Sequence, residues 1–267
     1  MRACLTFFKM RLINGLQYRT AAWAGVFTQF FWGFMEIQLY SAFYADHAAA
    51  FPMQFAHLVS YIWLRQAFLA LLNTWTFENE LFEMILNGNV AYELCRPTSL
   101  YGMWFSRTAA LRLSRAVLRF WPILLVASLL PEPWGMHLAA SPLTFVWFVV
   151  SMALTVCVTV AFTLIVYFTC FYTVSADGVR AVLTPLTDFL GGGVIPLPFM
   201  PDWLSRIVKY SPFGAMANAP LRIYSGDISG SAVYEMLALQ LIWLTALIGL
   251  GMLMQKKGMK RLCVQGG

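Results

Sequence analysis

Charged side chains inside otherwise apolar segments are the residues of this sequence that are best placed to do chemistry. Glu36 lies in the apolar run Ala21–Phe43, and Arg65 lies in the next run, Phe55–Trp75. A charge left alone in the hydrocarbon of a bilayer costs about 2.5–3.5 kcal/mol or more. Because consecutive spanning helices run antiparallel, the two charges can reach similar depth. We therefore predict a Glu36–Arg65 pair, which is either structural or part of a substrate path.

Three arginines recur with helical spacing near one end of a later apolar run. Arg112, Arg115 and Arg119 stand at i, i+3 and i+7, so they fall on one face of a helix. Such side chains can snorkel to the phosphates of the inner leaflet. They can also form a basic vestibule for an anionic substrate, and the spacing leaves both interpretations open.

The sequence lacks the common motifs of enzymes. It contains no GxxxxGK[ST] phosphate loop, no HExxH and no GxSxG, and its three histidines are isolated. Asp177 and Asp188 are too sparse to form a two-carboxylate active site. The five cysteines form no CxxC pair, so we expect them to be small apolar fillers. We therefore expect no catalytic residue, no metal site and no cofactor in this chain.

Composition defines the class of protein that must position these residues. Of 267 residues, 60% are apolar and only 11% are charged. Soluble domains carry roughly 45–50% apolar and about 25% charged residues. This balance excludes a soluble, disordered or collagen-like chain, and it excludes a nucleic-acid partner despite the net charge of +6. The sequence predicts an all-α polytopic membrane protein whose main partner is the lipid bilayer.

Six apolar segments are close to the about 20 residues that a helix needs to cross a bilayer. The expected spans are Ala21–Phe43, Phe55–Trp75, Thr108–Leu130, Leu143–Cys170, Val179–Ile195 and Ala232–Met254. They define a permease domain over residues 21–255, preceded by an N-terminal segment, 1–20, and followed by a basic tail, 256–267. Fourteen of the 18 Lys and Arg residues fall on the side of the two termini. By the positive-inside rule, both termini are expected in the cytoplasm.

The N-terminal segment has the pattern of an interfacial helix. Leu5, Phe8, Leu12 and Leu16 form one apolar stripe, and most of the basic residues lie elsewhere on the helix. We expect residues 2–18 to form an elbow helix along the inner leaflet. A simple topology anchor is the alternative.

The longest inner connection, residues 77–100, mixes acidic and apolar residues. Gly88-Asn89 can separate two short helices, and Pro97 can end the second. A compact knob of this kind suits docking into a partner protein, whereas the plain alternative is a solvated loop.

The longest outer connection, residues 191–224, cannot continue a regular helix. Three glycines are followed by three prolines, at Gly191, Gly192, Gly193, Pro196, Pro198 and Pro201. Trp203–Tyr210 then has the pattern of a short amphipathic helix, and Pro212 ends it. Broken, partly apolar structure beside the membrane favours re-entrant helices over an ordinary extracellular loop.

Taken together, these segments resemble the type-2 ATP-binding-cassette (ABC) exporter permeases, the ABC-2 family, and most closely its small bacterial six-span subgroup. Arg2–Tyr18 is similar to the N-terminal elbow of that family. The family's coupling helix is typically followed by Gly…Leu…Arg-Pro, which here is Gly88 through Leu94 to Arg96-Pro97. Its span five ends in a Gly/Pro-rich turn, which here is Leu190–Pro201.

The resemblance implies a transport subunit of a bacterial plasma membrane. Two permease subunits, identical or related, would form the path, and two separate ATPase subunits would bind ATP and Mg²⁺. The resemblance places ATPase coupling at Ile85, Gly88, Asn89, Val90, Tyr92, Glu93, Leu94, Arg96 and Pro97. Hydrophobic or amphipathic cargo, such as a drug, a lipid-linked glycan or a peptide, would be compatible.

Three other classes compete with this interpretation. A secondary transporter needs coupling-ion residues near the midplane and often an internal repeat, and only Glu36 and Arg65 support it. An intramembrane enzyme needs a polar catalytic cluster within the spans. A scaffold subunit without its own substrate path is compatible with the sequence.

Overall fold

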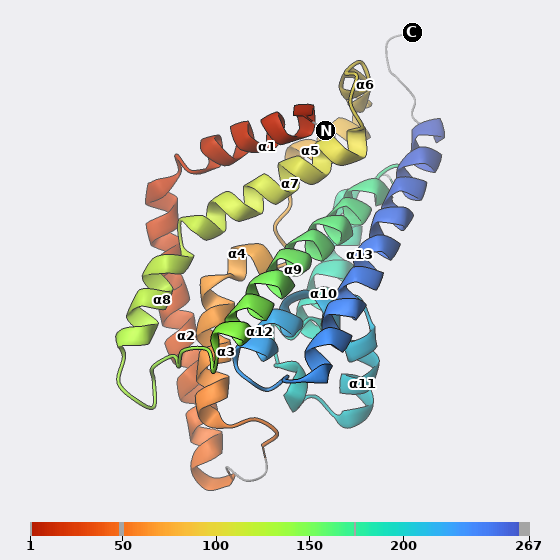
Figure 1. Cartoon of the computed structure of the whole chain (residues 1–267). Coiled ribbons are helices and arrows are strands. Elements are labelled where there is room, and N and C mark those ends of the chain that lie inside the picture. The colour runs from red at the N-terminus through yellow and green to blue at the C-terminus, as the bar shows by residue number, and fades with distance from the viewer. Residues whose placement is uncertain (1, 48–50, 174, 262–267) are drawn as a thin grey trace.

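The computed structural model describes residues 2–47, 51–173 and 175–261. The protein is 77% helical, and no strand occurs in those ranges. The predicted all-α class is therefore confirmed. Figure 1 shows long helices running between two ends of the molecule, with α1, α5, α6 and the last turns of α13 at one end and α11 at the other.

The expected spans correspond in order to helices or pairs of helices. These are α2 (Arg19–His47), α3 (Phe55–Ala67) with α4 (Leu69–Leu72), α7 (Leu100–Val117) with α8 (Phe120–Leu129), α9 (Pro142–Thr169), α10 (Ala176–Leu190) and α13 (Ser231–Gly258). Within the described ranges, two helical segments are long and apolar enough to cross a membrane by length and composition, α9 and Ser231–Arg261. The 15-residue α10 is short for a span.

Two expected spans are not continuous helices, which corrects the prediction. The helix over Thr108–Leu130 breaks at Leu118 and Arg119, between α7 and α8. Pro122 explains this break, because its ring would clash with the carbonyl of Leu118 in an unbroken helix. The helix over Phe55–Trp75 breaks at Phe68 and ends at Leu72. Apolar composition predicts burial in lipid, but it does not predict whether the helix is continuous.

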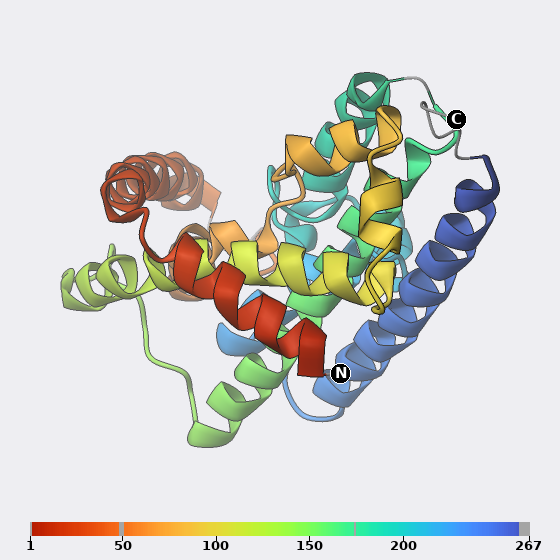
Figure 2. The ribbon, with the colours of Figure 1, turned by 90° about the horizontal axis from the view of Figure 1, so that it is seen from above.

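The N-terminal helix α1 (Arg2–Gly15) lies over α7 (Figure 2). Its close approach depends on Gly15, where a Cβ atom would lie 2.2 Å from Ser114 Oγ. None of its residues is buried, and Leu5, the first residue of the predicted stripe, is exposed. The face of α1 that points away from α7 is therefore exposed.

The inner connection forms two short helices, α5 (Asn79–Leu86) and α6 (Val90–Leu94). Gly88 joins them with a φ of 71°, a conformation that favours glycine. Leu81 and Phe82 pack in a cluster with Trp104 of α7 and Tyr167 of α9. This cluster anchors the pair of helices to the end of the bundle.

The outer connection is a turn followed by short helices. After α10, Gly192 takes a φ of 82°, and the chain continues through η2 (Leu197–Phe199), α11 (Asp202–Tyr210), η3 (Gly214–Asn218) and α12 (Ala219–Tyr224). Helix α12 packs against α9 and α3, so the chain returns into the bundle. The buried Gln240 of α13 holds this segment, because it donates hydrogen bonds to Ala215 O (3.0 Å) and Thr155 Oγ1 (2.8 Å).

The predicted basic tail begins within α13. Lys256 and Lys257 lie in its last turn, and Met259–Arg261 form a 3-10 helix, η4. Residues 262–267 of that predicted tail, including Cys263, lie outside the described residues.

Candidate functional site

Glu36 of α2 and Arg65 of α3 meet in the structure. The Arg65 guanidinium forms an ion pair with the Glu36 carboxylate, and the two side chains are only 10% and 13% exposed. Gln66 Nε2 lies 3.4 Å from the same carboxylate. The antiparallel alignment used to pair these charges therefore holds at this point.

Arg65 also binds the end of a third helix. Its Nη1 donates to the carbonyl of Gly193 and lies 3.5 Å from the carbonyl of Gly192. These carbonyls follow the last turn of α10, where backbone acceptors lack helical partners and the helix dipole favours a cation. The ion pair therefore joins α2, α3 and α10 and satisfies the polar backbone of the glycine turn.

Arg112 performs a similar role at the end of α4. It is fully buried, and it donates to the carbonyls of Asn73 and Leu71 and to Thr163 Oγ1 (3.0 Å). The expectation that Arg112 snorkels to lipid or lines a vestibule with Arg115 and Arg119 is wrong. Buried backbone that leaves a helix needs donors, and Arg112 supplies them.

Arg115 and Arg119 line a central cavity of about 630 Å³. The cavity lies between α2, α3, α4, α7 and α10. Glu36 and Arg65 also line it, as do Asp188, Gly191 and Gly193 at the end of α10. The structure therefore brings together two of the three predicted vestibule arginines, the Glu36–Arg65 ion pair and part of the glycine turn.

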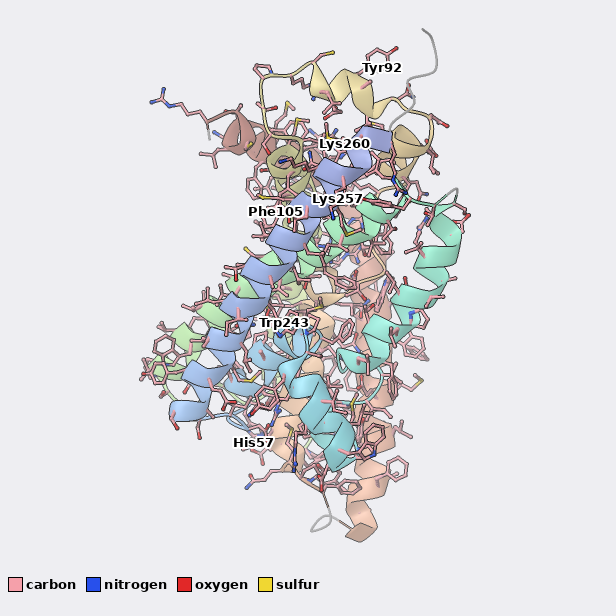
Figure 3. The ribbon with its side chains drawn as sticks, turned by 90° about the vertical axis from the view of Figure 1, so that its right-hand side faces the viewer. His57, Tyr92, Phe105, Trp243, Lys257 and Lys260 are labelled. Atoms are coloured by element: carbon pink, nitrogen blue, oxygen red, sulfur yellow. The ribbon has the colours of Figure 1, made fainter. Side chains whose placement is uncertain are left out.

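The predicted coupling residues divide into a buried base and an exposed tip. Ile85, Gly88 and Val90 are buried and shape the two helices. Tyr92 is 75% exposed and Leu94 is 40% exposed. Asn89, Arg96 and Pro97 are also exposed, and Glu93 pairs with Arg96 at 3.3 Å. Figure 3 shows Tyr92 at the extreme end of the molecule, opposite His57.

The sequence did not predict how the base of these helices is held. Arg107 of α7 is buried and forms ion pairs with Glu78 (2.9 Å) and with Glu80. The hydrogen bond from Arg107 lowers the pKa of the Glu80 carboxyl below its usual value. The sequence offered one signal: Glu78 and Glu80 stand at the start of the inner connection, and the basic residue Arg107 precedes the next apolar segment.

Arg180 of α10 makes the second contact with the base. It donates to Asn79 Oδ1 (3.1 Å), and its guanidinium lies over the rings of Phe77 and Phe82, 5.3 and 5.1 Å from their centroids. Tyr167 of α9 makes the third, because its hydroxyl accepts from the backbone N–H of Glu78 at 2.8 Å. The α5–α6 pair is thus bound to α7, α9 and α10.

The remaining predicted turn residues shape the outer segment. Pro196 precedes η2, Pro198 lies within it, and Pro201 precedes α11. Among the residues that the structure describes, no group of three or more His, Cys, Asp or Glu side chains is placed to hold a metal ion.

Comparison with known proteins identifies the family. No curated protein shows significant sequence similarity to the chain. The family described as ABC-2 family transporter protein matches residues 57–266, which is well over half of the chain. The match covers the α5–α6 pair, the central helices and the outer turn. The chain therefore belongs to the ABC-2 transporter family, whose members are membrane-embedded transport subunits.

Proposed function

We propose that this chain is the permease subunit of an ATP-driven exporter. Two permease subunits, identical or related, enclose the path, and two ABC ATPase subunits that bind ATP and Mg²⁺ dock on α5 and α6. The complex lies in a bacterial plasma membrane with both termini in the cytoplasm. The observation that carries the proposal is the exposed tip of the α5–α6 pair on a firmly held base.

The tip has the character of a docking surface. Tyr92 and Leu94 are large side chains exposed at the end of the molecule. Aromatic anchors surrounded by polar residues dominate many protein interfaces. Val90 and Ile85 are buried beneath the tip, so its conformation is set before a partner binds.

The base supplies a route for the movement of a docked partner. A displacement of α5 pulls on α7 through the ion pair of Glu80 with Arg107 and on α10 through the hydrogen bond of Asn79 with Arg180. The other end of α10 is held by Arg65, which binds Glu36 of α2. Rigid helices linked in this way move as bodies, and ATP drives transport when it favours one arrangement over the other.

The cavity suits a hydrophobic or amphipathic cargo. Trp32, Leu69 and Leu72 provide apolar surface, and Gln29 and Asn73 provide hydrogen-bonding groups. Most small-molecule sites combine an apolar wall with a few polar groups, in volumes of about 300–1,000 Å³. A drug, a lipid-linked glycan or a peptide has this mixed character.

The test compares ATP hydrolysis by the purified chain with hydrolysis by its complex with an ABC ATPase encoded beside it. We expect none from the chain alone and clear activity from the complex. Tyr92→Ala should weaken assembly or lower the activity of the complex severalfold. Trp203→Ala removes another largely exposed aromatic residue, at the other end of the molecule, and should change neither. Hydrolysis by the rigorously purified chain, or equal effects of both variants, would refute the proposal.

A further inference from the structure

Two cavities share two lining arginines, Arg115 near the end of α7 and Arg119 just before α8. Arg115 and Arg119 line both the central cavity of about 630 Å³ and a smaller cavity of about 400 Å³. The smaller cavity is formed by the end of α1, the start of α2 and α7. It lies at the α1–α2 corner, near the end of the molecule that bears α5 and α6, and shares two lining residues with the central cavity.

Positive charge is in excess at this junction. The charged residues that line the two cavities are Arg11, Arg65, Arg107, Arg115 and Arg119, with Glu36, Glu78 and Asp188. Ion pairs neutralise Arg65 and Arg107. In the described part of the chain, Arg11, Arg115 and Arg119 have no carboxylate within 4.0 Å. Asp188 of α10, beside the glycine turn, has no basic side chain within 4.0 Å among the residues that the structure describes.

Arg119 is held in place and still has a free donor. Its guanidinium lies against α2 at Gly25, where a Cβ atom would come within 2.6 Å of the guanidinium carbon. Its Nε is buried against Gly25, 2.8 Å from the position of that Cβ atom, and has no hydrogen-bond partner among the described residues, whereas the rest of the guanidinium contributes to the lining of both cavities. A buried donor without a partner is unfavourable, and a guanidinium fits the oxygens of a phosphate or carboxylate.

Apolar side chains line the central cavity together with these arginines. Trp32, Leu69, Leu72 and Met216 contribute to this wall. Trp32 and Trp75 are both half exposed, so the cavity opens to the outside of the chain. A ligand could therefore keep its charged end at Arg119 and place an apolar body in the cavity.

We infer that the transported molecule is an anionic amphiphile. A phosphate-type or carboxylate-type head binds Arg115 and Arg119, and the apolar body occupies the central cavity. The head approaches these arginines from the side of the smaller cavity, which Arg11 also lines. This inference deepens the proposed export function and rests on it for the direction of transport.

The test measures how ligands protect a cysteine in the cavity. Thr28 lines the central cavity and is exposed, so Thr28→Cys in a cysteine-free background reports occupancy through its rate of alkylation by N-ethylmaleimide. The protein is placed in phosphatidylcholine nanodiscs, and the probe is dodecyl phosphate. We expect saturating dodecyl phosphate to slow alkylation at least tenfold. Dodecyltrimethylammonium and inorganic phosphate at equal concentration should have little effect.

Three variants test the arginines. Arg115→Gln, at an exposed position, should raise the dodecyl phosphate concentration needed for half protection by about tenfold, the value of one charged hydrogen bond. Gly25→Ala keeps every charge but displaces the Arg119 guanidinium, so it should weaken protection severalfold. The double change Arg2→Gln and Lys9→Gln removes two exposed charges from α1, outside both cavities, and should leave protection unchanged.

Several outcomes would overturn the inference. Equal protection by dodecyltrimethylammonium would exclude an anion site, and equal protection by inorganic phosphate would assign the site to a soluble anion. Unchanged protection in both Arg115→Gln and Gly25→Ala would exclude the arginine junction. Because this assay needs no ATPase, lost protection with intact ATP hydrolysis refutes this inference alone. Protection without any ATP hydrolysis by the complex refutes the proposed function alone.

Discussion

The ion pair between Glu36 and Arg65 allows a quantitative test by double-mutant cycle. The single changes are Glu36→Gln and Arg65→Gln, and the third variant carries both. Each single change leaves one buried charge without its counter-ion. Arg65→Gln also removes the donor to the Gly193 carbonyl, so the two single changes are not equivalent.

The magnitudes follow from these contacts. Breaking a buried ion pair from one side destabilises soluble proteins by about 3–5 kcal/mol. We expect Glu36→Gln near the lower end, because Arg65 keeps its carbonyl acceptors. Arg65→Gln should cost about 1–3 kcal/mol more, since a buried carbonyl loses its donor. The double variant should be more stable than the sum of the single effects by about 2–3 kcal/mol.

The assay is the free energy of unfolding in mixed micelles titrated with sodium dodecyl sulfate. The control is the same cycle on Lys209 and Glu235, a pair at 3.0 Å whose side chains are 33% and 44% exposed. Exposed pairs contribute about 0–1 kcal/mol, so this cycle should show little coupling. Additive effects of Glu36→Gln and Arg65→Gln would mean that the two side chains do not interact. Equal coupling energies in the two cycles would mean that burial does not determine how strongly an ion pair stabilises this protein.

The remaining predictions concern orientation, the buried arginine of α7 and helix packing. In intact cells and a cysteine-free background, an impermeant thiol reagent should label the cysteine of Leu138→Cys but not that of Tyr92→Cys, and the reverse would invert the topology. Arg112→Lys keeps the charge but removes the planar guanidinium that reaches several acceptors. The free energy of unfolding in mixed micelles should therefore fall by about 1.5–3 kcal/mol. An unchanged free energy of unfolding would contradict the role of Arg112 as donor to the end of α4. Gly33→Ala should destabilise by about 1–3 kcal/mol, because its Cβ would lie 2.8 Å from a buried indole. Gly249→Ala should be neutral or slightly stabilising, because a Cβ atom there would have no neighbour within 4 Å. Equal changes in the free energy of unfolding for the two glycine variants would exclude close packing at Gly33.

The sequence predicted those features in which a single residue type is unfavourable in its local setting, such as a charge in an apolar segment or a proline in a helix. Glu36 and Arg65 could be paired because each is expensive alone in an apolar run. The turn after α10 could be predicted because glycines and prolines there exclude a continuous helix. The division of the inner connection at Gly88 follows from the same kind of local rule.

The features that the sequence did not predict depend on partners distant along the chain. Arg112 has the spacing of a surface residue, and only the fold brings Asn73 and Thr163 to it. The break between α7 and α8 had a local signal in Pro122, but hydropathy masked it. The ion pair between Arg107 and Glu78 joins residues 29 positions apart in the chain, so no local pattern reveals it.

The contact between Tyr92 and an ATPase subunit tests the central claim most directly. A photo-activatable crosslinker attached through Tyr92→Cys, in the assembled complex and a cysteine-free background, should form a covalent adduct with the ATPase. The same crosslinker attached through Leu138→Cys, at an exposed position in the connection between α8 and α9, should form none. An adduct from Leu138→Cys alone, or none from Tyr92→Cys in a complex that hydrolyses ATP, would contradict docking on α5 and α6.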